Sequence, residues 1–280
     1  MILVTTAGKV GSEAVRLLRQ RGLPVRVLMR NREKAGALAE MGAEIAAGDL
    51  AVPRTIDEAM AGVTTVVLVS GGLPAQELGV IHSAVRAGVA HVIKITSDAS
   101  ADSPIARRRW HAAIEAGLAA SGLGHTLLRS NAYMQNFLAL APTIAQTGGF
   151  GSSAGTGRVG MVDARDVGAV AAAIAAAPAP HVGKTYRLTG PELLAYSDVA
   201  AALSTVLGRP ITYRTLSFED DKAAMIRAGV PAQVAEMNAQ FFGLIAAGDA
   251  AWLSEDVPSL LDRPARTFRQ FAVDYAAAFS

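Results

Sequence analysis

Two glycines near the start of the chain are spaced for holding a phosphate group through the backbone. Gly8 and Gly11 stand between a short apolar run and a helical pattern. A helix N-terminus offers unpaired N–H groups and a positive dipole end to an anion, and glycine lets the backbone approach it closely. This order suits a dinucleotide pyrophosphate. The full G-x-G-x-x-G pattern is absent because Thr5 or Thr6 stands where its first glycine would fall, so an ordinary helix start is an equal alternative.

A basic residue at the end of the second expected strand bears on which dinucleotide is bound. NAD-specific sites place Asp or Glu on the ribose hydroxyls there. This chain instead has Arg30, nineteen positions after Gly11, with Arg32 and Lys34 close behind. A guanidinium suits a 2′-phosphate better than a diol. The pattern favours NADP(H), and the alternative is a solvated basic helix start.

Two further turns at expected strand ends could contact the same cofactor. Asp49 could accept a hydrogen bond from the adenine amino group, although a loop or helix-capping aspartate has the same pattern. Ser70 and Gly71 follow the fourth expected strand and could pass close to the ribose or pyrophosphate, with a plain turn as the alternative. The candidate cofactor-binding residues are Thr6, Gly8, Lys9, Val10, Gly11, Arg30, Asp49, Leu50, Ser70 and Gly71.

The elements that would position these residues alternate between strand and helix. The expected strands are 2–5, 24–29, 44–46, 65–69, 91–96 and 125–128, and the expected helices are 12–18, 31–41, 56–61, 75–87 and 104–121. Continuous apolar strands separated by helices indicate a parallel sheet covered on both faces. The predicted fold is therefore α/β, a doubly wound parallel sheet.

The pattern changes in the second half of the chain. Residues 148–160 are rich in glycine and serine without periodicity, which predicts a loop, and Asp163 to Asp166 indicates a capped helix start. Four helical patterns and one strand near 211–213 follow residue 191. We predict a dinucleotide-binding domain over 1–190 and a smaller, mostly helical substrate lobe over 191–280.

Composition limits the class of protein. The chain has 280 residues, of which 51% are hydrophobic and 18% charged, so it can bury a substantial core. The absence of cysteine excludes disulfides, iron–sulfur clusters and a cysteine nucleophile. The most apolar long run, 167–179, is too short for a membrane span. With no export signal recognised, a cytoplasmic location is expected.

Three other functions are set aside. Gly151 to Gly155 matches the nucleophile-elbow pattern of hydrolases, but it lies within the expected loop rather than between a strand and a helix. The five histidines lack ligand spacing, so no metal site is expected. The formal charge of +2 gives no argument for nucleic acid, and Arg107 to Arg109 is better explained as a solvated helix face.

Taken together, the chain resembles the NmrA-like branch of atypical short-chain dehydrogenases, which includes quinone oxidoreductases and triphenylmethane reductase. The resemblance covers nearly all of the chain and rests on residues 2–11, 30–35, 48–50, 103–106, 128–137 and 183–191. It implies a Rossmann-like domain, NADPH bound at the carboxyl edge of the sheet, and a substrate cleft under the C-terminal lobe.

The resemblance also suggests catalytic residues. Carbonyl-reducing members of the wider superfamily use a Tyr-x-x-x-Lys pair as proton donor, and no tyrosine of this chain has a lysine four residues later. The lysine position of the related isoflavone reductases falls at His111 and the tyrosine position at Arg107. His111 is thus a candidate for contacting the nicotinamide ribose or relaying a proton, with a partly exposed helix histidine as the alternative. Ser97 holds the place of the active-site serine, or is a turn residue, and Tyr133 completes the candidate set.

Loss of the acid pair favours an acceptor that takes a hydride without prior protonation, such as a quinone or a cationic dye. The residues that could line a pocket for such a planar, apolar molecule are Tyr133, Met134, Phe137, Phe150 and Trp110, with core packing expected for about half of them. Two functions remain: an NADPH-dependent reductase of quinone-like acceptors, and a non-catalytic NADP(H)-binding redox sensor. The expected partner is a small planar substrate, with a homodimer left open and neither nucleic acid nor membrane expected.

Overall fold

The computed structural model describes residues 1–71 and 73–280. The side chains of Arg32 and Lys34, which the sequence places near Arg30, lie outside the described part. The chain forms two compact units that interleave in sequence. Unit 1 contains residues 1–130, 164–187 and 259–262, and unit 2 contains residues 131–163, 188–258 and 263–280. The division at residue 190 stays a prediction about where the chain could be cut into domains.

Unit 1 is built on a seven-stranded sheet in the order β3-β2-β1-β4-β5-β6-β9. The strands are β1 (Ile2–Val4), β2 (Val25–Met29), β3 (Glu44–Ala47), β4 (Thr65–Leu68), β5 (His91–Thr96), β6 (Gly124–Ser130) and β9 (Thr185–Leu188). Every pair from β3 to β6 is parallel. This order reverses between β1 and β4, which creates the switch point where doubly wound sheets bind ligands. The predicted α/β fold is confirmed.

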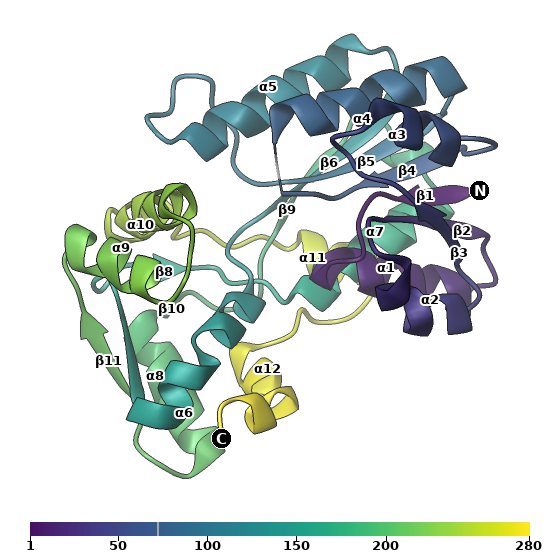
Figure 1. Cartoon of the computed structure of the whole chain (residues 1–280). Coiled ribbons are helices and arrows are strands. Elements are labelled where there is room, and N and C mark those ends of the chain that lie inside the picture. The colour runs from purple at the N-terminus through teal and green to yellow at the C-terminus, as the bar shows by residue number, and fades with distance from the viewer. Residues whose placement is uncertain (72) are drawn as a thin grey trace. The chain divides into compact units, whose positions relative to one another are not determined.

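Helices cover both faces of this sheet, as Figure 1 shows: α3, α4 and α5 on one face, and α1, α2 and α7 on the other. Their bounds are α1 (Lys9–Gln20), α2 (Gly36–Glu40), α3 (Pro53–Ala59), α4 (Pro74–Ala87), α5 (Ala106–Ala120) and α7 (Ala164–Ala176), with 3-10 turns η1 (Arg32–Ala35) and η3 (Ala179–His181). The predicted helix start near Asp163 is confirmed by α7. This helix packs tightly on α1, because a Cβ at Gly168 would lie 2.8 Å from the Val10 carbonyl oxygen.

Unit 2 combines short strands with helices. Strand β7 (Gly149–Ser152) pairs in parallel with β11 (Thr212–Thr215), and β8 (Arg158–Val159) pairs antiparallel with β10 (Leu194–Ala195). The remaining elements of this part of the chain are η2 (Met134–Ala139), α6 (Ala141–Thr147), α8 (Tyr196–Leu207), α9 (Phe218–Arg227), α10 (Ala232–Ala246), α11 (Asp256–Leu261), α12 (Phe268–Asp274) and η4 (Ala276–Ala278).

The predicted loop over 148–160 is wrong, because β7 and β8 lie within it. The glycines that suggested a loop instead allow two strands to approach closely: a Cβ at Gly149 would lie 2.6 Å from the Thr212 hydroxyl oxygen. The candidate nucleophile elbow, residues 151–155, begins within β7 and continues into a turn, with no helix after it. The hydrolase interpretation therefore lacks the helix that must directly follow a nucleophilic serine.

An aromatic cluster forms the core of unit 2. The Phe137 ring lies 5.3 Å from Tyr196 and 5.7 Å from Phe150, centroid to centroid, and Phe268 packs on the same ring. Met134, Phe137 and Phe150 are buried in this cluster, with at most 3% of each residue exposed. The core packing expected for about half of the five candidate pocket residues is confirmed for these three. Tyr133 and Trp110 remain partly exposed.

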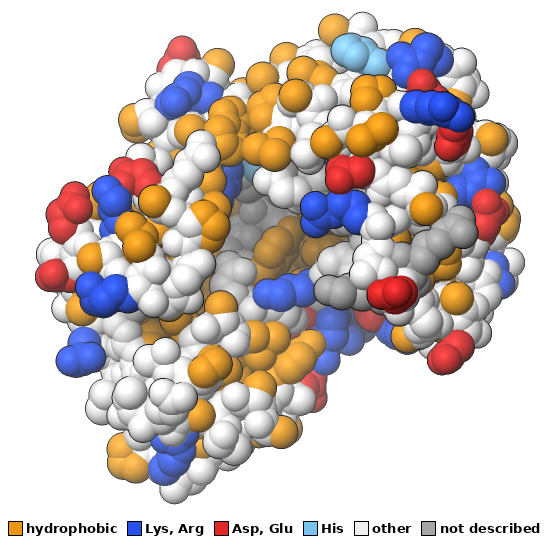
Figure 2. Space-filling model, in the orientation of Figure 1, with side chains coloured by type: hydrophobic (Ala, Val, Ile, Leu, Met, Phe, Trp, Pro, Cys, Tyr) orange, Lys and Arg blue, Asp and Glu red, His pale blue; other side chains and the backbone are white. Residues whose placement is uncertain are grey.

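The surface is mixed in charge. Figure 2 shows basic and acidic side chains interspersed over one face of the molecule. Among the described residues, no helix combines the length and apolar character needed to cross a membrane.

Candidate cofactor and catalytic site

The glycine turn leaves space at the N-terminus of α1. Gly8 is the N-cap residue in an extended conformation, no side chain caps the helix, and its first turn carries no acidic residue. A Cβ on Gly8 would meet no atom within 4 Å, whereas a Cβ on Gly11 would lie 1.9 Å from the Thr6 carbonyl oxygen. Gly11 therefore lets the helix pack beneath the turn, and Gly8 leaves room above it for an anion.

The two threonines at the place of the missing glycine have a role that the sequence did not reveal. Thr5 Oγ1 donates to the Val69 carbonyl at 2.7 Å and accepts from the Val69 N–H at 2.9 Å. Thr6 Oγ1 donates to the same carbonyl at 3.0 Å. The two threonines join the end of β1 to the end of β4. Because they stand where the dinucleotide-binding pattern has a glycine, the turn at the switch point is more rigid than a glycine would make it.

Arg30 and Asp49 lie next to each other along the same edge of the sheet. The Gly48 N–H donates to the Met29 carbonyl at 3.0 Å, which ties the turn after β3 to the end of β2. Arg30 is exposed and forms no ion pair with another described residue. Asp49 Oδ1 accepts from the Ala51 N–H at 2.9 Å, a loop role, and its contact with adenine stays a prediction.

Ser70 and Gly71 extend this edge beyond β4. A Cβ on Gly71 would meet no atom within 4 Å, so the turn has open space on that side. Ser70 Oγ donates to Glu77 Oε1 on α4 at 2.5 Å. Glu77 in turn forms an ion pair with Lys94 of β5, and both side chains are buried. Sequence analysis missed this pair, although one lysine inside an otherwise apolar strand was a usable signal.

The turn after β5 is held by arginines. Ser97 follows the strand directly, and its neighbour Asp98 lies 3.2 Å from Arg187 Nη2 and 3.9 Å from Arg108 Nη2. Arg109 donates to the Ser103 carbonyl at 2.6 Å. Arg109 is exposed, as the interpretation of Arg107 to Arg109 as a solvated face expects, whereas Arg108 is half-buried and its ion pair joins α5 to Asp98, next to Ser97.

His111 is buried on α5, with 8% of the residue exposed, and its Nδ1 has no hydrogen-bond partner. Burial, followed by the positive charges of Lys94 and Arg107, lowers the pKa of His111 to about 3. The imidazole is therefore neutral at pH 7. The alternative of a partly exposed helix histidine is wrong, and an orphaned buried nitrogen is what a bound ligand group would satisfy.

The candidate residues fall in different units. The glycine turn and the residues that follow β2, β3, β4 and β5 share one edge of the sheet in unit 1, and His111 belongs to the same unit. Tyr133 belongs to unit 2, where it pairs with Val162 and precedes Met134, whose N–H donates to the Val162 carbonyl at 2.9 Å.

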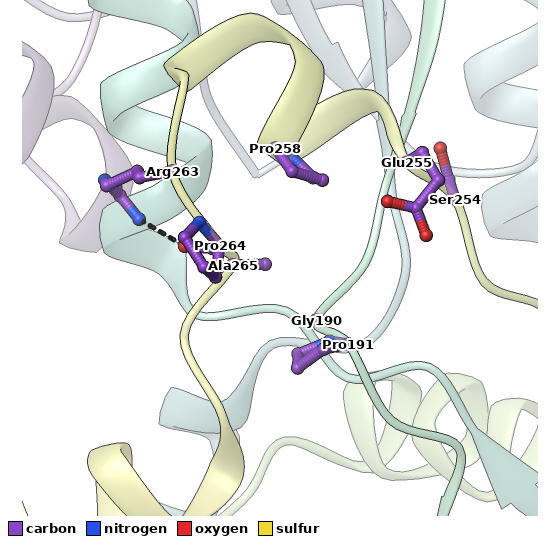
Figure 3. A pocket seen from close by; sticks show the side chains of 8 residues that line it. All are labelled: Gly190, Pro191, Ser254, Glu255, Pro258, Arg263, Pro264 and Ala265. Atoms are coloured by element: carbon purple, nitrogen blue, oxygen red, sulfur yellow. Dashed lines mark hydrogen bonds between the residues drawn. The ribbon is translucent and has the colours of Figure 1, made fainter.

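Unit 2 also contains a cavity of about 430 Å³ that sequence analysis did not predict. Figure 3 shows its lining residues, which are Gly190, Pro191, Ser254, Glu255, Pro258, Arg263, Pro264 and Ala265. The segments before and after α11 supply a carboxylate and a guanidinium, and Arg263 Nη1 donates to the Pro264 carbonyl at 3.0 Å. This volume is within the range of small-molecule sites.

Comparison with known proteins assigns the family. Residues 1–265 match the model of the NmrA-like family. The chain belongs to this family. It is 38% identical to an NAD(P)H azoreductase of Xenophilus azovorans, over 100% of this chain and 99% of the relative. The expected resemblance is confirmed.

Two solved structures of family members are similar over almost the whole chain. The NADPH-dependent quinone oxidoreductase of Escherichia coli, in complex with NADPH, is 30% identical with a TM-score of 0.89, covering 99% of this chain and 100% of that one. The triphenylmethane reductase of Citrobacter sp., in complex with NADP(H), is 28% identical with a TM-score of 0.87 and the same coverage.

Proposed function

We propose that this member of the family is an NADPH-dependent reductase that transfers a hydride to a quinone-like or other planar, apolar acceptor. The observation that carries the proposal is the open space above Gly8 at an uncapped helix N-terminus, with the unpaired Arg30 on the same sheet edge. The names of the relatives, a reductase of azo compounds and one of quinones that each use a nicotinamide dinucleotide, support it.

The described residues fit the dinucleotide. The backbone from Gly8 to Gly11 would hold the pyrophosphate, because the space beside Gly8 is open and the helix dipole favours an anion. Arg30 would bind the 2′-phosphate, since it is exposed and has no carboxylate partner among the described residues. Asp49 and the open side of Gly71 would face the adenosine half. When bound, NADPH supplies the hydride.

His111 positions a reactant in this proposal and does not act as an acid. With its pKa lowered to about 3, the imidazole stays neutral at pH 7 and cannot supply a proton from an imidazolium. Its orphaned Nδ1 can form one hydrogen bond with the nicotinamide ribose. Of the two roles that the sequence suggests for His111, its burial favours contact with the nicotinamide ribose over relay of a proton. Ser97, at the same edge of the sheet, would contact the nicotinamide carboxamide or the acceptor.

Orientation is then the main catalytic device. A quinone or azo acceptor takes a hydride directly and gains its proton from water, so no Tyr-x-x-x-Lys pair is required. The partly exposed ring of Trp110, next to His111 on α5 of unit 1, is the proposed stacking partner of such an acceptor.

The test measures NADPH oxidation by purified protein with a panel of quinones, an azo dye and a triphenylmethane dye. The matched control is Gly8→Val, which fills the space above the turn while leaving the packing at Gly11 intact. We expect turnover with at least one acceptor and loss of NADPH binding in the variant. Tight NADPH binding without turnover of any acceptor would contradict the reductase and favour the redox sensor, and no binding would contradict both.

A further inference from the structure

A buried ion pair lies beneath the proposed cofactor edge of unit 1. Glu77 of α4 and Lys94 of β5 expose 0% and 1% of their side chains, and Lys94 Nζ lies 2.6 Å from Glu77 Oε2. Lys94 Nζ also donates a hydrogen bond to the Ile95 carbonyl at 2.5 Å. Lys94 is thus anchored to the end of β5 and holds Glu77 by charge.

A gain in folding stability does not explain why this buried ion pair is present. Removing two charges from water costs about as much as their attraction returns, so a well-packed apolar pair of the same volume would serve the fold equally well. The role of the ion pair is better explained by the residue that Glu77 holds in place. The only polar contact of Glu77 Oε1 among the described residues is Ser70, whose hydroxyl donates to it at 2.5 Å.

Ser70 lies where the chain leaves β4 for the proposed site. The Val69 backbone beside it is bound by Thr5 and Thr6, and the open space of Gly71 follows it. The nearby carboxylate Glu115 is already engaged by Thr96 at 3.0 Å and by Arg129 at 2.5 Å. Glu77 is therefore a buried acceptor that holds the Ser70 hydroxyl from beneath the turn.

We propose that Glu77, paired with Lys94, is a positioning residue that fixes Ser70 and the turn after β4 for cofactor binding. This inference rests on the proposed function, because it requires that the turn contacts NADPH. A hydroxyl bound to an ionised acceptor is held more firmly than one bound to a neutral acceptor. The pair thus makes the turn rigid before the cofactor arrives, which reduces the ordering that binding requires.

The experiment compares NADPH dissociation constants in a double-mutant cycle. Ser70→Ala cuts the link and leaves the buried pair intact. Glu77→Leu combined with Lys94→Met removes both charges together, so that neither is left unpaired in the core. Loss of one hydrogen bond to a charged group predicts about a tenfold weaker NADPH affinity in each. Combining all three changes should weaken binding no further, because both routes break the same link.

Controls separate positioning from folding. Ser70→Thr keeps the hydroxyl and should restore the wild-type dissociation constant, and Ser83→Ala, at a buried serine of α4, should leave it unchanged. KM for NADPH should rise about tenfold in Ser70→Ala while kcat stays within about twofold. An unchanged affinity in the Glu77 and Lys94 variant, or strictly additive losses, would overturn the inference.

The readouts also distinguish this inference from the function it rests on. If the wild-type protein binds no NADPH, the proposed function fails. If the wild type binds and Ser70→Ala binds equally well, the positioning role alone is wrong. Ser70→Ala removes a single hydroxyl and leaves both buried charges in place, so this second comparison holds even where the variant without the two charges does not fold.

Discussion

The buried imidazole of His111 predicts a specific acid sensitivity of the fold. The ordinary pKa of histidine is 6.5, and burial with the charges of Lys94 and Arg107 lowers that of His111 to about 3. The folded protein therefore keeps His111 neutral where the unfolded chain binds a proton. Stability from this group is complete above about pH 6.5 and is lost as the pH falls toward 3.

The magnitude follows from the gap between the two pKa values. Over the whole window the loss is roughly 5 kcal/mol, and at pH 5 it reaches roughly 2 kcal/mol. The second figure is a large share of the roughly 5 to 15 kcal/mol that stabilises a typical domain. The effect should therefore be visible at pH values where most carboxylates are still ionised.

The assay is urea unfolding of the wild type and of His111→Leu at pH 7.5 and pH 5. Leucine matches histidine closely in volume and cannot titrate. Because the variant also removes an unpartnered buried nitrogen, it should be as stable as the wild type or about 1 to 3 kcal/mol more stable at pH 7.5. The wild type should lose about 2 kcal/mol more than the variant on acidification.

The matched control is His82→Gln, a change at an exposed histidine of α4. It should follow the wild type at both pH values. Other groups also respond to acid, since burial lowers the pKa of His91 and His181, but they are common to all three proteins. Equal acid losses in the wild type and in His111→Leu would refute the reasoning.

The remaining predictions concern the cofactor edge. Gly11→Ala should unfold at clearly lower urea, because its Cβ would lie 1.9 Å from a carbonyl oxygen, whereas Gly8→Ala should keep its stability and bind NADPH at least about tenfold more weakly. Arg30→Ala should weaken NADPH much more than NADH in fluorescence titrations, with Arg21→Ala as the exposed control; equal losses would remove the 2′-phosphate argument. Thr5→Val should lower the free energy of unfolding by about 1 to 3 kcal/mol, since the Val69 N–H loses its acceptor, and a neutral result would contradict the proposed link between strand ends.

The sequence could predict elements whose signal is local. Strand β5 lies at the predicted residues, and α4 begins within one residue of its predicted start, because continuous apolar runs and helical periodicity depend only on near neighbours. Strand β7 was missed for the opposite reason. Its glycines resemble a loop until the partner strand β11, more than fifty residues away, is in place.

By itself, then, the sequence determined the order of strand, glycine turn and helix, the arginine after the second strand, and the family, since each depends on residue types at fixed short spacings. The tertiary structure decided what the other polar residues do. Thr5 reaches Val69 only because the sheet order sets β1 beside β4, and Glu77, which Ser70 contacts at the start of the next helix, reaches Lys94 only because β5 lies beside β4. The same packing buries His111, and burial, which no residue type reveals, is what keeps its imidazole neutral.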